Sequence, residues 1–369
     1  MPARACLAAC LIVAALAATA PAGADTVIGV AGPMSGSFAS FGEQMRAGAS
    51  QAVDDVNQAG GVNGSSLALQ AMDDKCDPKT ADAVANQLAG KGAAMVVGHL
   101  CLGASLAAAS VYVATSIVEI SPGTTWPDYT DKRPGPGIYR LAGRDDRQGA
   151  VAGQAIAGRF ADRAVAVIND RSVYGKQLAD ATRRAMNAAG KREAFTEEYD
   201  AGQRDFTGLV ERLQAANIGV LYIGGHAAEA GQIAQQVRAA GLDTVIVGPD
   251  ALISTEYRDG AGGASEGTLV TFAPDARDTP QAAAVVAAFR DRGIEPEGYV
   301  LPSYAAVQIW AQAARAARSD DHGAIVAAID SGRFATVLGD ITFNDKGDTS
   351  LPSFVLYEWR NGRLSPAGT

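Results

Sequence analysis

Asp250 is the residue whose type and position most directly suggest binding of a charged group. It follows an apolar run at 245–247 and the pair Gly248-Pro249, so it lies just after a predicted strand. A buried carboxylate must be paired, and a ligand ammonium is a partner that makes its burial tolerable. Aspartate is also a common N-cap of a following helix. The residues alone leave these two roles open.

Further candidates lie on loops after predicted strands or at the start of predicted helices. Gly123, Thr124 and Thr125 follow the predicted strand at 117–120, and the glycine lets a ligand approach the backbone closely. The alternative for this loop is a Pro-Gly turn with solvated threonines. Tyr174 opens a predicted helix, where it either contacts a ligand or is simply a half-buried aromatic residue.

Motifs for catalysis or cofactor binding are absent from the sequence. The first predicted strand runs into Gly32-Pro33-Met34 without a Gly-x-Gly-x-x-Gly motif, and neither a P-loop nor a Gly-x-Ser-x-Gly elbow occurs. His99 has no metal-ligand spacing around it, and His226 with Glu229 supplies too few ligands for a closed metal site. We therefore expect no catalytic residue, no cofactor and no metal, although fold class alone does not exclude an enzyme.

The N-terminus has the pattern of a signal peptide. Arg4 supplies a positive charge, residues 5–18 are apolar but too few to span a bilayer, and Ala22-Gly23-Ala24 forms a small-x-small cleavage site. We expect residues 1–24 to be removed by cleavage near Ala24. The mature protein is then expected outside the cytoplasm, in the periplasm.

Cys76 and Cys101 are the two of four cysteines that remain after this cleavage. Each lies at the end of a short apolar run. An even number of cysteines in an exported protein indicates a disulfide, and a loop of this length predicts stabilisation of roughly 3–4 kcal/mol. The alternative is a pair of buried free thiols.

Composition limits the class of protein and of partner. The chain has 369 residues, 48% of them hydrophobic and 19% charged, with a net charge of −9. Such a chain is globular and long enough for two domains. The acidic balance argues against nucleic acid or an anionic membrane surface as partner.

Strands and helices are predicted to alternate along most of the chain, which favours parallel sheets covered on both faces. This alternation begins with a strand at 26–31, and it begins again after Arg144-Asp145-Asp146. Strands are expected at 26–31, 67–72, 93–97, 117–120, 164–168, 194–199, 220–223, 245–247 and 354–359. Helices are expected at 41–58, 78–88, 104–113, 174–189, 206–216, 280–290, 299–317 and 322–330, and between 226 and 240.

Several motifs occur in the order in which one known family carries them. They are Gly32-Pro33-Met34-Ser35-Gly36, Asp73-Asp74-Lys75-Cys76-Asp77-Pro78, Gly98-His99-Leu100-Cys101, Tyr174-Gly175, Phe206, Gly224-Gly225, Gly248-Pro249, Ser303-Tyr304-Ala305-Ala306 and Asp345-Lys346-Gly347-Asp348. This pattern resembles the periplasmic substrate-binding proteins of branched-chain amino acid ABC transporters, the leucine/isoleucine/valine-binding protein family. The resemblance covers essentially all of the mature chain.

The resemblance implies an α/β protein with the type I periplasmic binding fold. Two doubly wound parallel-sheet lobes would be joined by a three-strand hinge, with the ligand cleft between them. The N-terminal lobe would comprise residues 25–144 and 273–351. The C-terminal lobe would comprise residues 145–272 and 352–369.

Some positions match the family pattern for ligand binding. The loop of Gly123, Thr124 and Thr125 would hold the amino and carboxylate groups of an amino acid. Tyr174 would contact the ligand from the C-terminal lobe. Asp250 would face the ligand ammonium, although the family usually has glutamate there.

Other positions depart from that pattern. Leu102 stands where the family carries a serine that binds the ligand carboxylate, so the pocket is expected to be narrower or more apolar, with Ser105 at most a partial replacement. His226 and Phe41 stand where tyrosine is usual. Tyr299 matches an aromatic lining position, and Trp126 extends the expected aromatic wall.

The resemblance implies a binding protein that delivers an amino acid, branched-chain or related, to the membrane permease of an ABC importer. Lobe closure over the ligand would drive capture, and we expect a monomer. Alternatives are a binder of aromatic or aliphatic carboxylates and a ligand-sensing module of the same fold. An α/β enzyme is the least favoured alternative.

Overall fold

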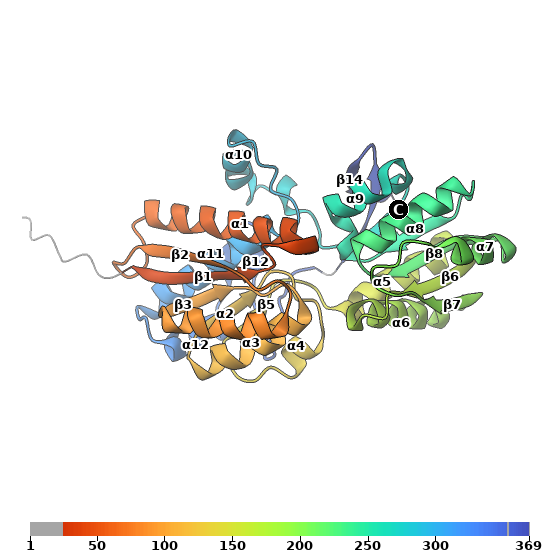
Figure 1. Ribbon diagram of the computed structural model, residues 1–369. Helices are drawn as coiled ribbons and strands as arrows, with labels where there is room; N and C mark the ends of the chain where they lie inside the picture. The colour runs from red at the N-terminus through yellow and green to blue at the C-terminus, as the bar shows by residue number, and fades with distance from the viewer. Residues whose placement is uncertain (1–24, 353, 369) are drawn as a thin grey trace, which may run out of the picture.

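The apolar run that follows residue 25 forms a strand inside the first sheet, with a neighbouring strand on each side. The computed structural model describes residues 25–352 and 354–368, which form two lobes (Figure 1). Five parallel strands make the sheet of the first lobe, in the order β2-β1-β3-β4-β5. They are β1 (Thr26–Gly32), β2 (Leu67–Asp73), β3 (Ala93–Val97), β4 (Val118–Ser121) and β5 (Ile138–Arg140).

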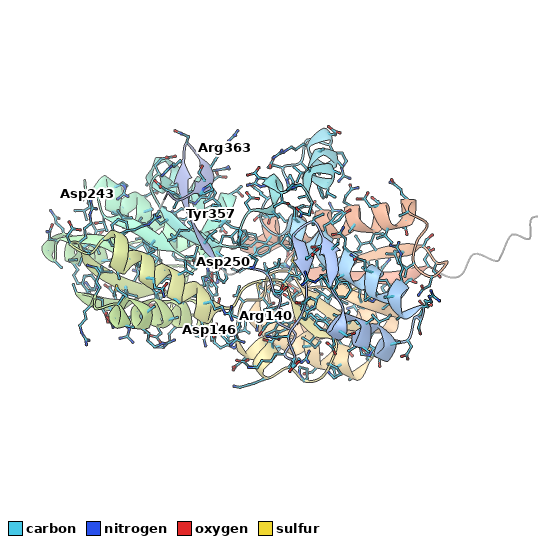
Figure 2. The ribbon with its side chains drawn as sticks, turned by 180° about the vertical axis from the view of Figure 1, so that it is seen from behind. Arg140, Asp146, Asp243, Asp250, Tyr357 and Arg363 are labelled. Carbon is cyan, nitrogen blue, oxygen red and sulfur yellow. A yellow bond between two sulfur atoms is a disulfide. The ribbon has the colours of Figure 1, made fainter. Side chains whose placement is uncertain are left out.

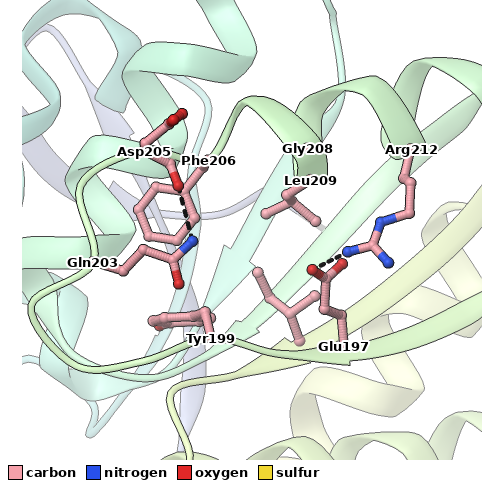
Figure 3. A pocket seen from close by; sticks show the side chains of 9 residues that line it. Glu197, Tyr199, Gln203, Asp205, Phe206, Gly208, Leu209 and Arg212 are labelled. Atoms are coloured by element: carbon pink, nitrogen blue, oxygen red, sulfur yellow. Dashed lines mark hydrogen bonds and ion pairs between the residues drawn. The ribbon is translucent and has the colours of Figure 1, made fainter.

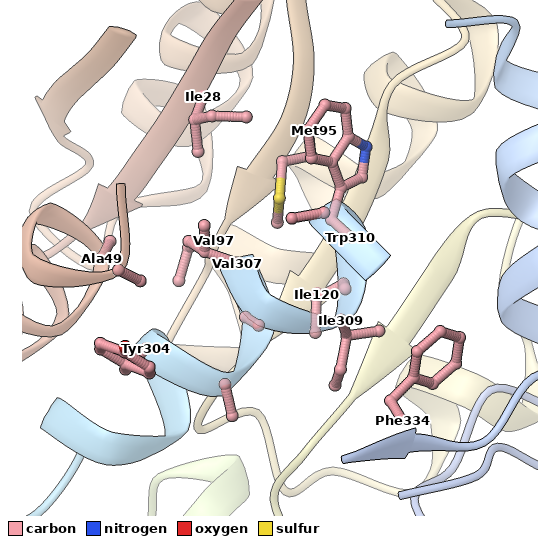
Figure 4. Packing of buried hydrophobic residues seen from close by; sticks show 14 of the residues in the cluster. Ile28, Ala49, Met95, Val97, Ile120, Tyr304, Val307, Ile309, Trp310 and Phe334 are labelled. Atoms are coloured by element: carbon pink, nitrogen blue, oxygen red, sulfur yellow. The ribbon is translucent and has the colours of Figure 1, made fainter. Parts of the chain in front are cut away.

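Helices cover both faces of this sheet, because alternate strand residues point to opposite sides. Ile28 and Val30 of β1 pack in one apolar cluster, whereas Ala31 packs in the other. Figure 4 shows the first cluster, in which strand residues meet Val307 and Trp310. Its helices are α1 (Ala39–Gln58), α10 (Ala283–Asp291), α11 (Val300–Ala317) and α12 (His322–Ser331); those of the opposite face are α2 (Pro78–Gly90) and α3 (Leu102–Ala114).

The second lobe contains a seven-stranded sheet in the order β14-β13-β10-β9-β8-β6-β7. Its strands are β6 (Ala164–Asn169), β7 (Phe195–Glu198), β8 (Ile218–Gly224), β9 (Val245–Gly248), β10 (Leu269–Phe272), β13 (Val355–Arg360) and β14 (Arg363–Pro366). The strands from β7 to β10 are parallel, whereas β13 and β14 are antiparallel additions at one edge. This edge differs from the purely parallel sheet that the sequence predicts.

Helices also cover both faces of the second sheet. One face carries α7 (Thr207–Ala215), α8 (Ala227–Ala239) and α9 (Thr255–Ala261), and the other carries α5 (Asp145–Arg159) and α6 (Val173–Ala188). The remaining elements are α4 (Asp128–Asp131), β11 (Phe334–Thr336), β12 (Gly339–Ile341) and the 3-10 helices η1 (Gly36–Phe38), η2 (Asp250–Ile253), η3 (Gly262–Ser265) and η4 (Ala276–Asp278). None of the helices within 25–352 and 354–368 is long and apolar enough to cross a membrane.

The chain passes between the two lobes three times. It leaves the first sheet after β5, returns after β10 to form α10, α11 and α12, and leaves again after β12 to add β13 and β14. Three crossings are what the predicted three-strand hinge requires. The boundaries at 144/145, 272/273 and 351/352 stay a prediction, and the predicted signal peptide lies outside the described residues.

Candidate ligand-binding site

A cavity of about 120 Å³ lies between the two lobes, at the carboxyl ends of their parallel strands. Loops after parallel strands meet at one edge of each sheet, which is why residues far apart in sequence converge here. The structure brings together eight of the nine predicted ligand-binding residues. The cavity is lined by Phe38, Phe41, Leu100, Cys101, Leu102, Gly123, Thr125, Trp126, Asp145, Tyr174, His226, Asp250, Ala251 and Tyr299.

A disulfide braces the first-lobe side of the cavity, as the sequence predicts. Cys76 and Cys101 join the loops after β2 and β3, with their Cα atoms 5.3 Å apart. Asp74 supports the same loops, because its carboxylate accepts a 2.8 Å bond from the Cys76 backbone N–H and lies 2.6 Å from His99 Nδ1. Cys101 is the N-cap of α3, so these contacts fix where Leu102 enters the cavity.

Leu102 is the first residue of α3 and lines the cavity. Ser105, one turn further along, does not supply the missing hydroxyl. It is fully buried, and its Oγ lies 3.1 Å from the Cys101 carbonyl oxygen and 2.6 Å from Thr124 Oγ1. Leu102 forms the end of the cavity at the start of α3, which we call the cavity floor. This floor is therefore apolar at the position where the family pattern has a serine.

Thr124 is the predicted site residue that the structure does not bring into the cavity. Its hydroxyl donates a 2.9 Å bond to the His99 carbonyl and accepts a 2.8 Å bond from Ser121 Oγ. These partners lie inside the first lobe and hold the side chain away from the cleft. The neighbouring Gly123 and Thr125 do line the cavity.

Gly123 is required by close packing. A Cβ atom there would lie 2.3 Å from Leu100 Cδ1 and 2.8 Å from Tyr299 Cε1. The loop that follows is held from behind by Arg140, which is fully buried and donates to the Trp126 carbonyl at 2.7 Å. The loop is thus fixed between Tyr299 in the cavity and Arg140 beneath it.

Tyr174 enters from the second lobe on the first turn of α6. Ser172 caps this helix by accepting a 2.9 Å bond from the Gly175 N–H. A Cβ atom on Gly175 would lie 2.4 Å from the Gly224 carbonyl oxygen, so glycine is what lets α6 start directly against the end of β8. That contact places the Tyr174 ring over the cavity.

Asp250 is 5% exposed and accepts hydrogen bonds from both lobes. Tyr174 OH and Gln148 Nε2 donate to its Oδ1 at 2.5 and 3.0 Å, and Tyr299 OH donates to its Oδ2 at 3.3 Å. Tyr299 precedes α11 of the first lobe, so this last bond spans the cleft. Figure 2 shows Asp250 where the two lobes meet.

The N-cap alternative for Asp250 is wrong. Pro249 occupies the cap position of η2, and no side chain caps that helix. Burial raises the pKa of Asp250 above its usual range, while the bonds from Tyr174, Gln148 and Tyr299 lower it. Burial and the nearby Asp250 charge in turn raise the pKa values of both tyrosines well above the usual range.

His226 and the aromatic residues form one wall of the cavity. His226 Nδ1 lies 2.6 Å from Asp170 Oδ2, which orients the imidazole ring. Its ring centroid is 5.1 Å from that of Tyr174 and 5.4 Å from that of Phe38, which belongs to the other lobe. Phe41 and Tyr299 pack edge to face with centroids 5.3 Å apart.

Asp145 is a cavity residue that the sequence did not reveal as one. It is the first residue of α5 and only 2% exposed. Burial and the charge of Asp250 raise its pKa to about 7, although a hydrogen bond from Thr125 opposes the shift. Its only signal in the sequence is its place beside Asp146 at a crossing between the lobes. The sequence also did not indicate Phe38, Leu100 and Ala251, which line the cavity, or Gln148, which donates to Asp250.

A separate cavity of about 130 Å³ lies on the second lobe alone (Figure 3). Glu197 and Arg212 form an ion pair at its edge, and Gln203 Nε2 donates to the Asp205 carbonyl at 2.8 Å. The charged side chains at the edge of this cavity are already paired within the second lobe, unlike the acidic side chains of the cavity between the lobes. Across the described ranges there is no group of three or more side chains suited to hold a metal ion.

Comparisons with known proteins agree with this architecture. The periplasmic binding protein family model matches residues 26–363. The chain is 43% identical over 355 residues to Leu/Ile/Val-binding protein homolog 1 of Brucella suis, which covers 95% of each chain. It is 37% identical over 338 residues to a leucine-, isoleucine-, valine-, threonine- and alanine-binding protein of Pseudomonas aeruginosa, which covers 91% of this chain and 90% of that protein.

Solved structures resemble the whole fold. The branched-chain amino acid transporter substrate-binding protein LivJ of Streptococcus pneumoniae, in complex with isoleucine, has a TM-score of 0.84 at 24% identity and covers 92% of this chain and 98% of that one. An ABC transporter substrate-binding protein of Desulfitobacterium hafniense, in complex with leucine, has a TM-score of 0.78 at 26% identity and covers 93% and 100%. The expected fold class is confirmed.

Proposed function

Because the chain belongs to the periplasmic binding protein family, we propose that it captures an amino acid between its two lobes and delivers it to the permease of an ABC importer. The observation that carries this proposal is the buried Asp250 carboxylate, which lies in the cleft and accepts hydrogen bonds from both lobes. A ligand ammonium beside it supplies the positive charge that a buried carboxylate needs. Amino acids are also what the named relatives bind, according to their names.

The polar ends of an amino acid have separate places in the cleft. The ammonium lies next to Asp250 on the second lobe. The carboxylate lies toward the first lobe, where α3 begins at Leu102 and Thr125 follows the glycine turn. Backbone N–H groups at a helix N-terminus favour an anion, and they do so without the serine hydroxyl that Leu102 replaces.

Capture is proposed to work by closure of the lobes around the ligand. Contacts across the cleft already exist between Tyr299 and Asp250 and between Phe38 and His226. A ligand that touches both lobes stabilises the closed arrangement over any open one, which shifts the population toward closure. The three crossing segments are the proposed hinge.

The proposed setting is the periplasm, after cleavage of a signal peptide near Ala24. The protein acts there as a monomeric carrier, without catalysis and without a cofactor. Its closed, ligand-loaded form is the form that docks on the permease. Neither nucleic acid nor a membrane surface is a proposed partner, since the chain carries a net charge of −9.

A thermal-shift screen followed by calorimetry tests the ligand class. We expect stabilisation by small or branched amino acids, including leucine, valine, alanine and γ-aminobutyrate, and none by benzoate or aliphatic acids without an amine. Stabilisation by the acids alone would overturn the proposal and favour a carboxylate binder. A sensing role would predict that the protein binds an amino acid, but that cells lacking its gene take up that amino acid as fast as wild-type cells. An uptake assay with both kinds of cell measures this.

A further inference from the structure

A second carboxylate, Asp145, faces the same cavity as Asp250. It is 2% exposed, and its Oδ1 atom is buried without any hydrogen-bond partner among the residues that the structure describes. Buried carboxylate oxygens are nearly always hydrogen-bonded, because an unpaired one loses its hydration without replacement. An orphaned acceptor in a ligand cavity therefore points to a donor that the ligand brings.

The hydrogen bonds of the two carboxylates are unequal. Asp250 already receives bonds from Tyr174, Gln148 and Tyr299, all of them protein groups. Asp145 Oδ1 receives none within the described ranges. A ligand ammonium next to Asp250 has more than one N–H to place, and Asp145 offers the acceptor that the protein leaves open.

The charge balance of the cavity leads to the same conclusion. No lysine or arginine is among the described residues that line it. His226 is held by Asp170, and the Arg140 guanidinium binds Asp348 and the carbonyl oxygens of the loop behind the cavity. Two buried carboxylates thus face a space in which the ligand supplies the positive charge.

A structural role at the start of α5 does not account for these facts. Acidic residues are favoured in the first turn of a helix, and both Asp145 and Asp146 lie there. That preference explains an acid at this position. It does not explain why this acid is buried in the cavity with a free oxygen, since no side chain caps α5.

We propose that the ligand ammonium binds between Asp145 and Asp250, and that Asp145 selects ligands whose nitrogen keeps several N–H donors. This inference rests on the proposed function and names the nitrogen chemistry that the site accepts. A primary ammonium has donors for both carboxylates. N-Methylation removes these donors one by one and adds bulk between the two acids.

Binding is then accompanied by release of a proton. Burial and Asp250 raise the pKa of Asp145 to about 7, so the empty pair holds a proton below that pH. The arriving cation takes its place and the proton leaves to solvent, with no covalent bond made or broken. The charge of Asp146 also raises the pKa of Asp145, whereas the hydrogen bond from Thr125 and the charge of Arg140 lower it. Burial, together with the charge of Asp145, in turn raises the pKa values of the Tyr174, Tyr222 and Tyr299 phenols.

Titration calorimetry with leucine, alanine and γ-aminobutyrate tests this inference. We expect D145N to weaken binding of the tightest of the three at least tenfold and to abolish most of the proton release, measured at pH 6 in two buffers of different ionisation enthalpy. D146N is the matched control, because it removes the same charge from the adjacent, half-exposed residue. The control is expected to bind and to release protons as the wild type does.

A second measurement uses the unmodified protein, so that a misfolded variant leaves the inference testable. N-Methyl and N,N-dimethyl forms of the same amino acid are expected to bind progressively more weakly, by at least tenfold for each methyl group. Unchanged affinity of D145N, or of the methylated ligands, would overturn the role of Asp145 while the proposed function stands. Failure of the wild type to bind any of the three amino acids would instead contradict the proposed function.

Discussion

The Tyr174 hydroxyl donates a 2.5 Å hydrogen bond to Asp250 Oδ1, and the two residues come from different elements of the second lobe, α6 and η2. The same hydroxyl accepts a 3.3 Å bond from the Ala251 backbone N–H. Tyr174 therefore fixes both the carboxylate and the turn that carries it. The position of Asp250 in the cleft depends on where α6 begins, and hence on the close contact of Gly175 with β8.

Variants of Asp250 and Tyr174 are expected to distinguish what the Asp250 charge contributes to ligand affinity from what its position contributes. D250A should weaken leucine binding at least about 30-fold, because removing one partner of a buried charge pair costs about 2–5 kcal/mol. Y174F keeps the charge and the ring but loses the hydroxyl that bonds both Asp250 and the Ala251 N–H. The bond to Asp250 is the one that affects the ligand directly; it is worth about 1 kcal/mol, so a roughly fivefold loss of affinity is expected. Calorimetry on both variants measures the difference. Equal losses would show that Asp250 acts through position alone.

The stability of the empty protein should depend on Asp145 in a pH-dependent way. Its pKa rises from an ordinary 3.8 to about 7 on folding, so between these values the folded state binds more protons than the unfolded state. Stability contributed by this group is then lost as pH rises, by up to about 4 kcal/mol above pH 7. D145N removes this penalty and should be more stable than the wild type at pH 8.

Urea unfolding of ligand-free protein at pH 4, 6 and 8 measures this effect. The stability difference between D145N and the wild type should grow with pH. D146N, at a residue whose side chain is half exposed and paired with Arg144, should show no such trend. A constant difference across the three pH values would mean that folding does not raise the pKa of Asp145.

The sequence predicted nine of the strands, because short β-rich apolar runs such as β1 and β3 end in turn residues. It missed β5 and β10 of the two main sheets and the short strands β11, β12 and β14. Eight predicted cleft residues line the cavity. Gly123, Thr125 and Asp250 follow strands, and loops after parallel strands share one edge of a sheet. The predictions for Phe41, Leu102, His226 and Tyr299 came from the family resemblance. The prediction of a Cys76–Cys101 disulfide followed from the export signal and is confirmed.

Two features of the site could not be predicted, since both depend on packing between distant segments. Helix α5 is rich in alanine and glycine and carries few large apolar residues, so no periodicity marked it and Asp145 resembled a surface acid. Thr124 stood on the expected ligand loop. Its hydroxyl is instead bonded to Ser121 and His99, whose positions depend on β4 and on the loop after β3.

Removal of the disulfide should destabilise the protein and loosen the cavity floor. The cysteines are 25 residues apart, and a loop of this length predicts a loss of roughly 3–4 kcal/mol in the free energy of unfolding for the C76S/C101S variant. Ligand affinity should fall as well, because Cys101 caps the helix on which Leu102 lies. Urea unfolding and calorimetry measure the two effects. The variant should still fold, because the Asp74 carboxylate still accepts a hydrogen bond from the backbone N–H of residue 76 and still contacts His99 Nδ1.

Restoring a hydroxyl at the cavity floor should strengthen binding. L102S places a donor at the start of α3, beside the proposed site of the ligand carboxylate, and one added hydrogen bond is worth about 1 kcal/mol. We therefore expect leucine affinity to rise roughly fivefold. L106S is the matched control, because it makes the same change at an exposed position of the same helix. Calorimetry should show unchanged affinity for this control. A weaker L102S variant would show instead that the ligand carboxylate lies elsewhere and that Leu102 contributes apolar contact.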